Sequence, residues 1–241
     1  MNKELFKENL KLKADMIDVH LDDNQLEEFW NYKEMVLKWN NKINLTAIID
    51  DEDFINKHFI DSLTIAKYIP KQKGKMIDIG TGAGFPGIPL KIVNKDIEIV
   101  LFDALNKRLK VLEEIINSLK LKNIYTLHGR AEETFKNIEY REKYDIATSR
   151  AVANLSTLVE YMLPSVKVGG VCICMKAGNV EEESEKAKNA IKVLGGKIEK
   201  IENIVLPKTE IERTIIVIKK VSKTPNKYPR KPGIPNKEPI E

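Results

Sequence analysis

A run of glycines after a short apolar segment is the part of this sequence best suited to binding a cofactor. Residues 76–79 are apolar apart from Asp78, and the apolar residues beyond Pro86 predict a helix. A strand, a glycine loop and a helix start together make a nucleotide-type site, because glycine exposes bare backbone and the helix start offers free N–H groups. The glycines of this loop are Gly80, Gly82, Gly84 and Gly87.

Two cofactor classes fit this loop. Residues 82–87 have the GxGxxG spacing of dinucleotide-binding proteins, whereas residues 78–84 match the DxGxGxG loop of proteins that bind S-adenosylmethionine. Charge favours the second class, because the Asp78 carboxylate would repel a pyrophosphate but suits the ammonium and sulfonium groups of S-adenosylmethionine. A glycine-rich turn with only a structural role is the remaining alternative.

Further candidate ligand contacts follow the neighbouring predicted strands. Asp103 comes about 20 residues after the glycine loop, where an acid commonly accepts hydrogen bonds from ribose hydroxyls. Glu132 follows the tight turn after the third strand and could frame an adenine ring, although it could also simply start the next helix. Arg150 follows the fourth strand, so its guanidinium is expected at the mouth of the pocket.

Arg150 carries the clearest indication of the acceptor. Methyltransferases of exocyclic amines often have Asn-Pro-Pro-Tyr or Asp-Pro-Pro-Tyr here, and those of pyrimidine carbon 5 need a cysteine nucleophile near the pocket, yet the sequence offers neither. An arginine suits a carboxylate, a phosphate or the O6/N7 edge of guanine. Guanine N7 has a free lone pair, so methylation there needs alignment and electrostatics rather than a general base.

Strands and helices are predicted to alternate from residue 75 onward. Such alternation implies a mostly parallel α/β sheet covered on both faces, with its ligand at the carboxyl ends of the strands. The last two strands have no helix between them, which predicts an antiparallel pair at one edge. The strands are expected at 75–79, 98–102, 124–128, 145–148, 171–175, 197–205 and 214–220, and the helices at 86–93, 106–119, 153–163 and 180–194.

The first 73 residues are expected to form a helical cap. The second helix is predicted to start with Asn24 and Glu27 as a capping box, and the third in an acidic cluster that complements the helix dipole. The expected helices run from 3 to 17, from 22–24 to the interruption at 40–46, and from 50–53 to 68.

One stripe of the third predicted helix is polar. His58, Asp61 and Ser62 share this stripe with Ile65, because they are spaced at i, i+3, i+4 and i+7. The stripe could lie at the edge of the pocket, but the residues alone favour a His-Asp pair that ties the cap to the sheet.

Composition predicts a cytoplasmic globular protein. The chain has 241 residues, 42% hydrophobic and 32% charged, and its charged N-terminus and lack of a long apolar run predict neither a signal peptide nor a membrane anchor. Cys172 and Cys174 are two apart in a predicted strand, a poor arrangement for a disulfide or, without nearby histidines, for a metal. We expect both side chains to be buried in the protein core, which suggests a reducing compartment, and we expect no metal site.

The sequence divides into three predicted parts. The helical cap at 1–73 is followed by a Rossmann-like domain at 74–221 and by a basic tail at 222–241 that is rich in proline and lysine. The tail is predicted to contain neither a helix nor a central strand. Disorder is its default, and packing along a surface is the alternative.

Six motifs occur together in one order, at 41–46, 58–63, 78–90, 129–132, 149–153 and 230–235. In this combination the sequence resembles the bacterial ribosomal RNA small subunit methyltransferase G family, also called glucose-inhibited division protein B. The resemblance implies a class I, Rossmann-like methyltransferase. It also implies methyl transfer from S-adenosylmethionine to N7 of a guanosine in 16S ribosomal RNA, free or in the small subunit.

The resemblance also implies roles for individual residues. The donor would contact Gly80, Phe85, Ala131, Glu132 and Arg150, with Asp103 facing its ribose. Matches outside the donor loop give acceptor-side or site-shaping roles to Asn41, Asn44, His58, Asp61 and Ser62. One departure is Ala104, where the family often has serine, which affects at most one hydrogen bond near the ribose.

Two other functions remain open at this point. One is a methyltransferase with a small-molecule or protein acceptor, and the other is a nucleotide-binding or NAD-dependent protein without methyl chemistry.

Overall fold

The computed structural model describes residues 1–69, 74–150, 152–178 and 180–240. Residue 73, the predicted end of the helical cap, and Ala151 of the 149–153 motif lie outside these ranges.

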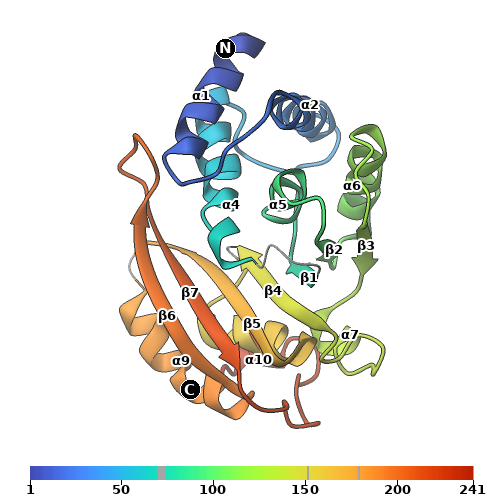
Figure 1. Ribbon diagram of the computed structural model, residues 1–241. Helices are drawn as coiled ribbons and strands as arrows, with labels where there is room; N and C mark the ends of the chain where they lie inside the picture. The colour runs from blue at the N-terminus through green and yellow to red at the C-terminus, as the bar shows by residue number, and fades with distance from the viewer. Residues whose placement is uncertain (70–73, 151, 179, 241) are drawn as a thin grey trace.

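Within the described residues, seven strands form one sheet in the order β3-β2-β1-β4-β5-β7-β6 (Figure 1). Strands β1 to β5 run parallel to one another, whereas β7 is antiparallel to both β5 and β6. The predicted mostly parallel sheet with an antiparallel pair at one edge is confirmed. The strands are β1 Lys75–Ile79, β2 Glu98–Asp103, β3 Ile124–His128, β4 Tyr144–Arg150, β5 Val166–Ala177, β6 Gly196–Val205 and β7 Glu212–Lys220.

Helices cover both faces of this sheet, because successive side chains of a strand point in opposite directions. In β1, Met76 packs with the N-terminal helices, α5 and α6, while its neighbour Ile77 packs with α7, α8 and α9. In the described ranges, no helix is both long and apolar enough to cross a membrane. The helical elements between the strands are α5 Gly87–Val93, α6 Asn106–Ser118, α7 Ala131–Thr134, α8 Leu155–Met162, the 3₁₀ turn η3 Leu163–Ser165, and α9 Glu181–Val193.

The two cysteines of β5 point to the α8 and α9 face. Cys172 and Cys174 are both fully buried free thiols, as the sequence predicts. Burial raises the pKa of Cys174 to about 12 and also raises the pKa of Cys172. Neither thiol is therefore a ready nucleophile.

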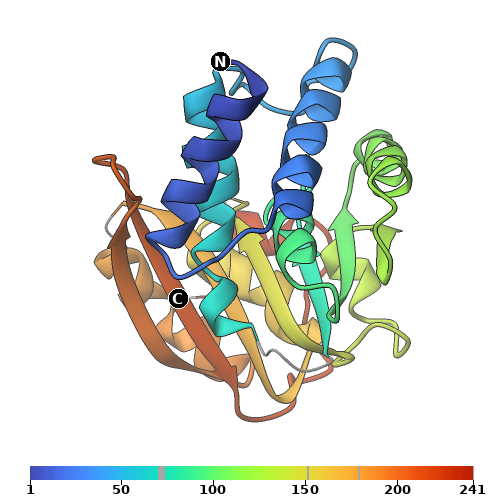
Figure 2. The same ribbon diagram turned by 45° about the horizontal axis from the view of Figure 1, so that its top comes forward.

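The N-terminal helices stand side by side over the other face of the sheet (Figure 2). The predicted capping box of Asn24 and Glu27 is wrong: the Asp22 carboxylate accepts from the Gln25 N–H at 2.8 Å, and Gln25 Oε1 accepts from the Asp22 N–H at 3.0 Å. Gln25 also donates to the Ile92 carbonyl of α5, which ties this earlier helix start to the sheet domain. The first two helices are α1 Lys3–Asp15 and α2 Asp23–Asn40.

The third helical segment is not the single regular helix that the sequence predicts. The Ser62 hydroxyl donates to the His58 carbonyl, and the Arg150 guanidinium donates to the Lys57 carbonyl. Because side chains compete for these carbonyls, the regular backbone pattern is broken. The segment consists of α3 Asp51–Phe54, the π-helical η1 Ile55–Ile60, α4 Asp61–Leu63 and the 3₁₀ turn η2 Ala66–Tyr68.

The tail packs against the domain, so disorder was the wrong default. Thr224 and Tyr228 are buried, and the Arg141 guanidinium donates to both of their carbonyls, at 2.7 and 2.8 Å. The tail also contains the helical turn α10 Ile234–Lys237, contrary to the prediction from its prolines. Pro235 is tolerated there because a proline in the first turn of a helix interrupts no backbone hydrogen bond.

Candidate functional site

The glycine loop between β1 and α5 adopts a backbone that requires glycine. Gly80, Gly82 and Gly84 have φ values of +73°, +60° and +101°. A Cβ on Gly80 would lie 2.6 Å from Val152 Cγ2, so a side chain there would also collide with the wall of the adjoining cavity.

Two buried carboxylates hold this loop in place. Asp78 Oδ2 accepts hydrogen bonds from the Thr81 hydroxyl and the Gly87 N–H, at 2.6 and 2.9 Å. Asp103 Oδ2 accepts from the Gly82 N–H at 3.0 Å. Burial raises the pKa of Asp78 to about 6, against the opposing effect of its hydrogen bonds. Asp78 thus braces the loop, and its predicted attraction for a cationic donor stays a prediction.

A cavity of about 200 Å³ opens at the carboxyl ends of β1, β2 and β3. It brings together four of the predicted donor contacts, Gly80, Asp103, Ala131 and Glu132. An apolar lining with an acid at two positions suits a nucleoside. The other lining residues are Ile79, Phe102, Ala104, Arg130, Val152 and Tyr161. We refer to this space as the donor cavity.

Tyr161 and Val152 are donor-cavity residues that the sequence reasoning missed. Tyr161 belongs to α8, and no motif around it indicates a ligand contact. Its place in the wall depends on how α8 packs, which local spacing does not predict.

The helical cap reaches the glycine loop from the other side. The Tyr32 hydroxyl of α2 donates to the Ala83 carbonyl at 2.7 Å and is fully buried. Phe85, at the end of the loop, packs with its ring centroid 5.3 Å from that of Tyr32. Phe85 therefore lies in the core between cap and loop and does not line the donor cavity.

Arg150 is surrounded by groups of the cap. Its Nη1 donates to the Lys57 carbonyl at 2.8 Å and lies 3.3 Å from Asp61 Oδ2, and its Nη2 lies 3.1 Å from His58 Nδ1. The other Asp61 oxygen, Oδ1, accepts from Arg213 Nε of β7 at 3.1 Å. Asp61 thus joins two guanidinium groups from different strands.

His58 is held as a neutral imidazole. Burial is the main cause that lowers its pKa to about 3, and the Arg150 charge adds to this effect. Because a guanidinium can only donate, Nδ1 accepts from Arg150, so Nε2 carries the proton and donates to the Thr46 hydroxyl at 2.8 Å. The ring also stacks on Phe85, with centroids 4.2 Å apart.

Arg150, His58 and Asp61 line a second cavity of about 230 Å³. Arg150 and His58 face this cavity and not the donor cavity, so contact between Arg150 and the donor stays a prediction. The remaining lining residues are Ile48, Lys57, Met175, Lys176, Ala177 and Arg213. We refer to this space as the basic cavity.

The other predicted acceptor-side residues do not line the basic cavity. Ser62 is fully buried and bonded to the His58 carbonyl, while Asn41 and Asn44 are exposed. The turn between α2 and α3 is held instead by Asn40, whose Oδ1 accepts from the Leu45 and Thr46 N–H groups. The sequence analysis placed Asn40 in the interruption at 40–46 but gave its side chain no role.

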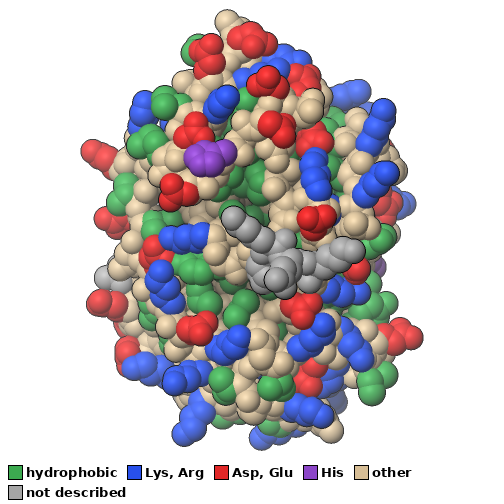
Figure 3. All heavy atoms as spheres, viewed as in Figure 1, with side chains coloured by type: hydrophobic (Ala, Val, Ile, Leu, Met, Phe, Trp, Pro, Cys, Tyr) green, Lys and Arg blue, Asp and Glu red, His purple; other side chains and the backbone are tan. Residues whose placement is uncertain are grey.

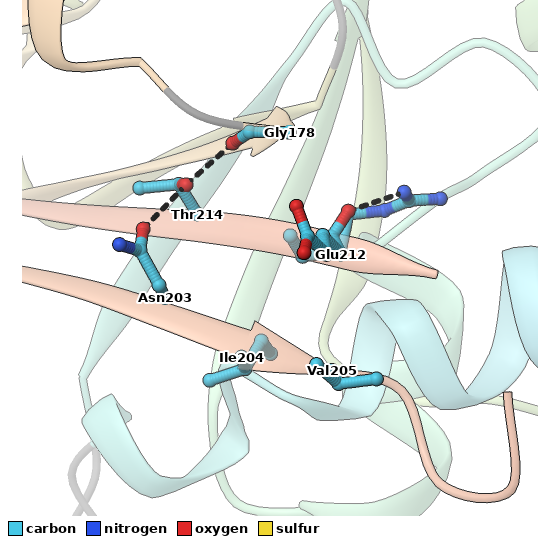
Figure 4. A pocket seen from close by; sticks show the side chains of 7 residues that line it. Gly178, Asn203, Ile204, Val205, Glu212 and Thr214 are labelled. Atoms are coloured by element: carbon cyan, nitrogen blue, oxygen red, sulfur yellow. Dashed lines mark hydrogen bonds between the residues drawn. The ribbon is translucent and has the colours of Figure 1, made fainter. Parts of the chain in front are cut away.

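A third cavity, of about 300 Å³, lies at the β6 and β7 edge of the sheet (Figure 4). In it, the Thr214 hydroxyl lies 2.6 Å from the Gly178 carbonyl and 2.8 Å from Asn203 Oδ1. These contacts fix the start of β7. The neighbouring residue of this strand, Arg213, lines both this cavity and the basic cavity.

The sequence matches known ribosomal RNA methyltransferases over most of its length. The family model described as GidB, rRNA small subunit methyltransferase G, matches residues 25–214. The ribosomal RNA small subunit methyltransferase G of Clostridium novyi (strain NT) is 47% identical over 242 residues, which cover 100% of both chains. The protein of that name from Acetivibrio thermocellus is 54% identical over 222 residues, which cover 92% of this chain and 91% of the relative.

Solved structures of low sequence identity share the fold. M. jannaschii TYW2 in complex with AdoMet superposes with a TM-score of 0.54 at 16% identity, covering 68% of this chain and 76% of that one. M. capricolum TrmK in complex with S-adenosyl-homocysteine gives a TM-score of 0.51 at 19% identity, covering 68% and 69%. The chain has the class I methyltransferase fold, and it belongs to the ribosomal RNA small subunit methyltransferase G family of S-adenosylmethionine-dependent enzymes, as its motifs predict.

Proposed function

We propose that this protein transfers the methyl group of S-adenosylmethionine to N7 of a guanosine in 16S ribosomal RNA. The observation that supports this most is the position of the donor and basic cavities at one edge of the sheet. Ile79 at the end of β1 lines the first, and Arg150 at the end of the adjacent β4 lines the second. A donor and an acceptor bound in these cavities would meet at the end of these two strands.

The basic cavity suits the edge of a guanine or a phosphate. Its charged lining consists of Lys57, Arg150, Lys176 and Arg213, against the single carboxylate of Asp61. Arginine pairs favourably with guanine O6 and N7 and with phosphate. Basic and acidic side chains are intermixed over the face seen in Figure 3, so this face has no broad basic patch that would indicate RNA binding. The proposal therefore rests on the residues that line the basic cavity.

The basic cavity also fits an acceptor that needs no general base. His58 has its Nδ1 occupied by Arg150, and its low pKa makes it a poor proton acceptor. Attack by guanine N7 uses a free lone pair, so the protein only has to align the ring and stabilise charge.

We assign roles to the site residues on the same basis. Gly80, Asp103, Ala131 and Glu132 would contact the donor, with Asp78, Gly82 and Gly84 shaping its loop. Arg150 would lie where donor and acceptor meet, with its guanidinium over the buried Phe85 ring, 5.1 Å from the ring centroid. His58 and Asp61 would orient Arg150, with Ser62 behind them and Asn41 and Asn44 on the exposed rim.

We further propose that residues 1–73, 74–221 and 222–241 form cap, catalytic domain and tail. The buried tail contacts indicate that the last two fold together. A cytoplasmic location follows from the proposed substrate, because bacterial ribosomal RNA is made there.

The test is methyl transfer from labelled S-adenosylmethionine to small ribosomal subunits and to naked 16S RNA that lack the modification. Digestion and mass analysis of the nucleosides should give 7-methylguanosine. A different methylated nucleoside, or none despite confirmed binding of S-adenosylhomocysteine, would contradict the proposed acceptor. Comparing the two RNA forms shows whether assembly is required.

A further inference from the structure

The tail segment 230–235 lies directly behind the donor cavity. The Gly233 N–H donates to Glu132 Oε1 at 3.1 Å, and Glu132 lines the cavity while being only 8% exposed. The tail therefore holds the carboxylate of a residue that lines the cavity.

The same segment also holds α8, which supplies Tyr161 to the cavity wall. The Arg230 guanidinium forms a bidentate pair with Glu160, whose carboxylate also accepts from the Arg230 N–H at 2.7 Å. One turn earlier on α8, the Thr157 hydroxyl donates to the Pro235 carbonyl at 2.9 Å.

The Glu160 pair is built for fixed geometry. The Glu160 side chain is fully buried, so removing its partner would leave a charge without compensation. A planar guanidinium on a carboxylate fixes orientation as well as distance. The pair therefore sets where α8, and with it Tyr161, stands against the cavity.

We propose that residues 230–235 are a positioning element for the methyl donor, acting through Glu132 and Tyr161. This rests on the donor site of the proposed function. The segment touches the wall from outside, so it should affect how tightly the donor binds and leave the rate of transfer from bound donor nearly unchanged.

The main test removes residues 230–235 and also neutralises Glu160, the buried carboxylate that would lose its partner Arg230. A chain ended after Pro229 keeps the Arg141 contacts to Thr224 and Tyr228, and Glu160→Gln in the same variant avoids an unpaired carboxylate. We expect the Kd for S-adenosylhomocysteine and the KM for the donor to rise about tenfold, with kcat within about twofold of the parent.

Two full-length controls accompany this variant. Glu160→Gln alone keeps the segment, and Lys231→Ala changes an exposed residue of the segment. Lys231→Ala should bind the donor within about twofold of the unmodified protein. Glu160→Gln weakens the pair with Arg230, so its Kd for S-adenosylhomocysteine should rise, but by less than in the shortened chain.

If the segment has only a structural role, its removal should lower the melting temperature and leave the donor KM of the folded enzyme unchanged. That result would overturn the proposal. If the shortened chain does not fold, full-length Thr157→Val decides, because it removes only the bond to Pro235. Its Kd for S-adenosylhomocysteine should rise two- to threefold, and an unchanged value would overturn the proposal. The binding measurement needs no RNA, so it stays readable even if the proposed acceptor is wrong.

Discussion

The donor cavity and the basic cavity lie at the same edge of the sheet but are built differently. The donor cavity is formed mainly by short segments that directly follow β1, β2 and β3. The basic cavity is formed by side chains from residues as distant in sequence as Lys57 and Arg213. The first therefore depends mainly on local backbone geometry, apart from the wall that α8 supplies, and the second depends on long-range pairing between the cap and the sheet.

The largest effect that would test this difference is the loss of Arg150. In Arg150→Ala, kcat should fall about 10²–10³-fold, because the guanidinium that we propose to hold the acceptor is removed. If Arg150 acts from the basic cavity, the Kd for S-adenosylhomocysteine, measured by calorimetry, should change little. Asp61 keeps Arg213 as a partner in this variant, so the fold should survive. An active Arg150→Ala enzyme would remove the residue from the mechanism.

Gly80→Ala is expected to damage the donor cavity instead. The new Cβ would meet Val152 in a backbone with positive φ, costing about 2–4 kcal/mol in stability and more than tenfold in donor affinity. Gly169→Ala is the matched control, since φ there is +90° and nothing lies within 4 Å of the new atom. Chemical denaturation of both variants separates the collision from the backbone strain. An equal loss of stability in the two variants would show that the contact with Val152 does not contribute to the effect of Gly80→Ala.

The pH dependence of stability should reveal His58. Its folded pKa, about 3, lies below the ordinary value of 6.5, so the unfolded chain binds the extra proton and stability falls as pH drops below 6.5. Between pH 7 and 5 the His58 contribution should be about 2 kcal/mol. Asp78 acts oppositely, because its folded pKa, about 6, is raised, and this favours the folded state as pH falls through 6.

The informative quantity is therefore the difference between the unmodified protein and His58→Gln at each pH. That difference should shrink as pH falls from 7 to 5. A constant difference for His58→Gln would mean that the imidazole is not held neutral.

The smallest effects are expected in the exposed turn between α2 and α3. Asn41→Ala and Asn44→Ala change exposed side chains, so stability should stay within about 0.5 kcal/mol. If they contact RNA, the KM for RNA should rise a few-fold with an unchanged donor Kd. No change in either constant would remove both residues from the acceptor side.

The parts of the structure that sequence predicted are those that local rules determine. The glycine loop follows from its spacing, and the sides of the sheet on which Cys172 and Cys174 lie follow from the period of a strand. The antiparallel edge follows from two strands without a helix between them.

What sequence missed depends on contacts between distant residues. Asp22 and Asn24 are both favourable N-cap residues. The helix starts at the earlier cap, Asp22, whose partner Gln25 also donates a hydrogen bond to the distant Ile92 carbonyl. The pairing of Asp61 with Arg213 and the docking of the tail on Glu160 join segments whose separation hides them from any local pattern.

The contact between Gly233 and Glu132 has a consequence for biosynthesis. Residues 230–235 leave the ribosome after every strand of the sheet and after α7 and α8, which they contact. A chain whose sheet has formed before residues 230–235 dock lacks the outer support of the donor cavity. Under the proposed positioning role, tight donor binding would begin only once residues 230–235 have docked on α7 and α8.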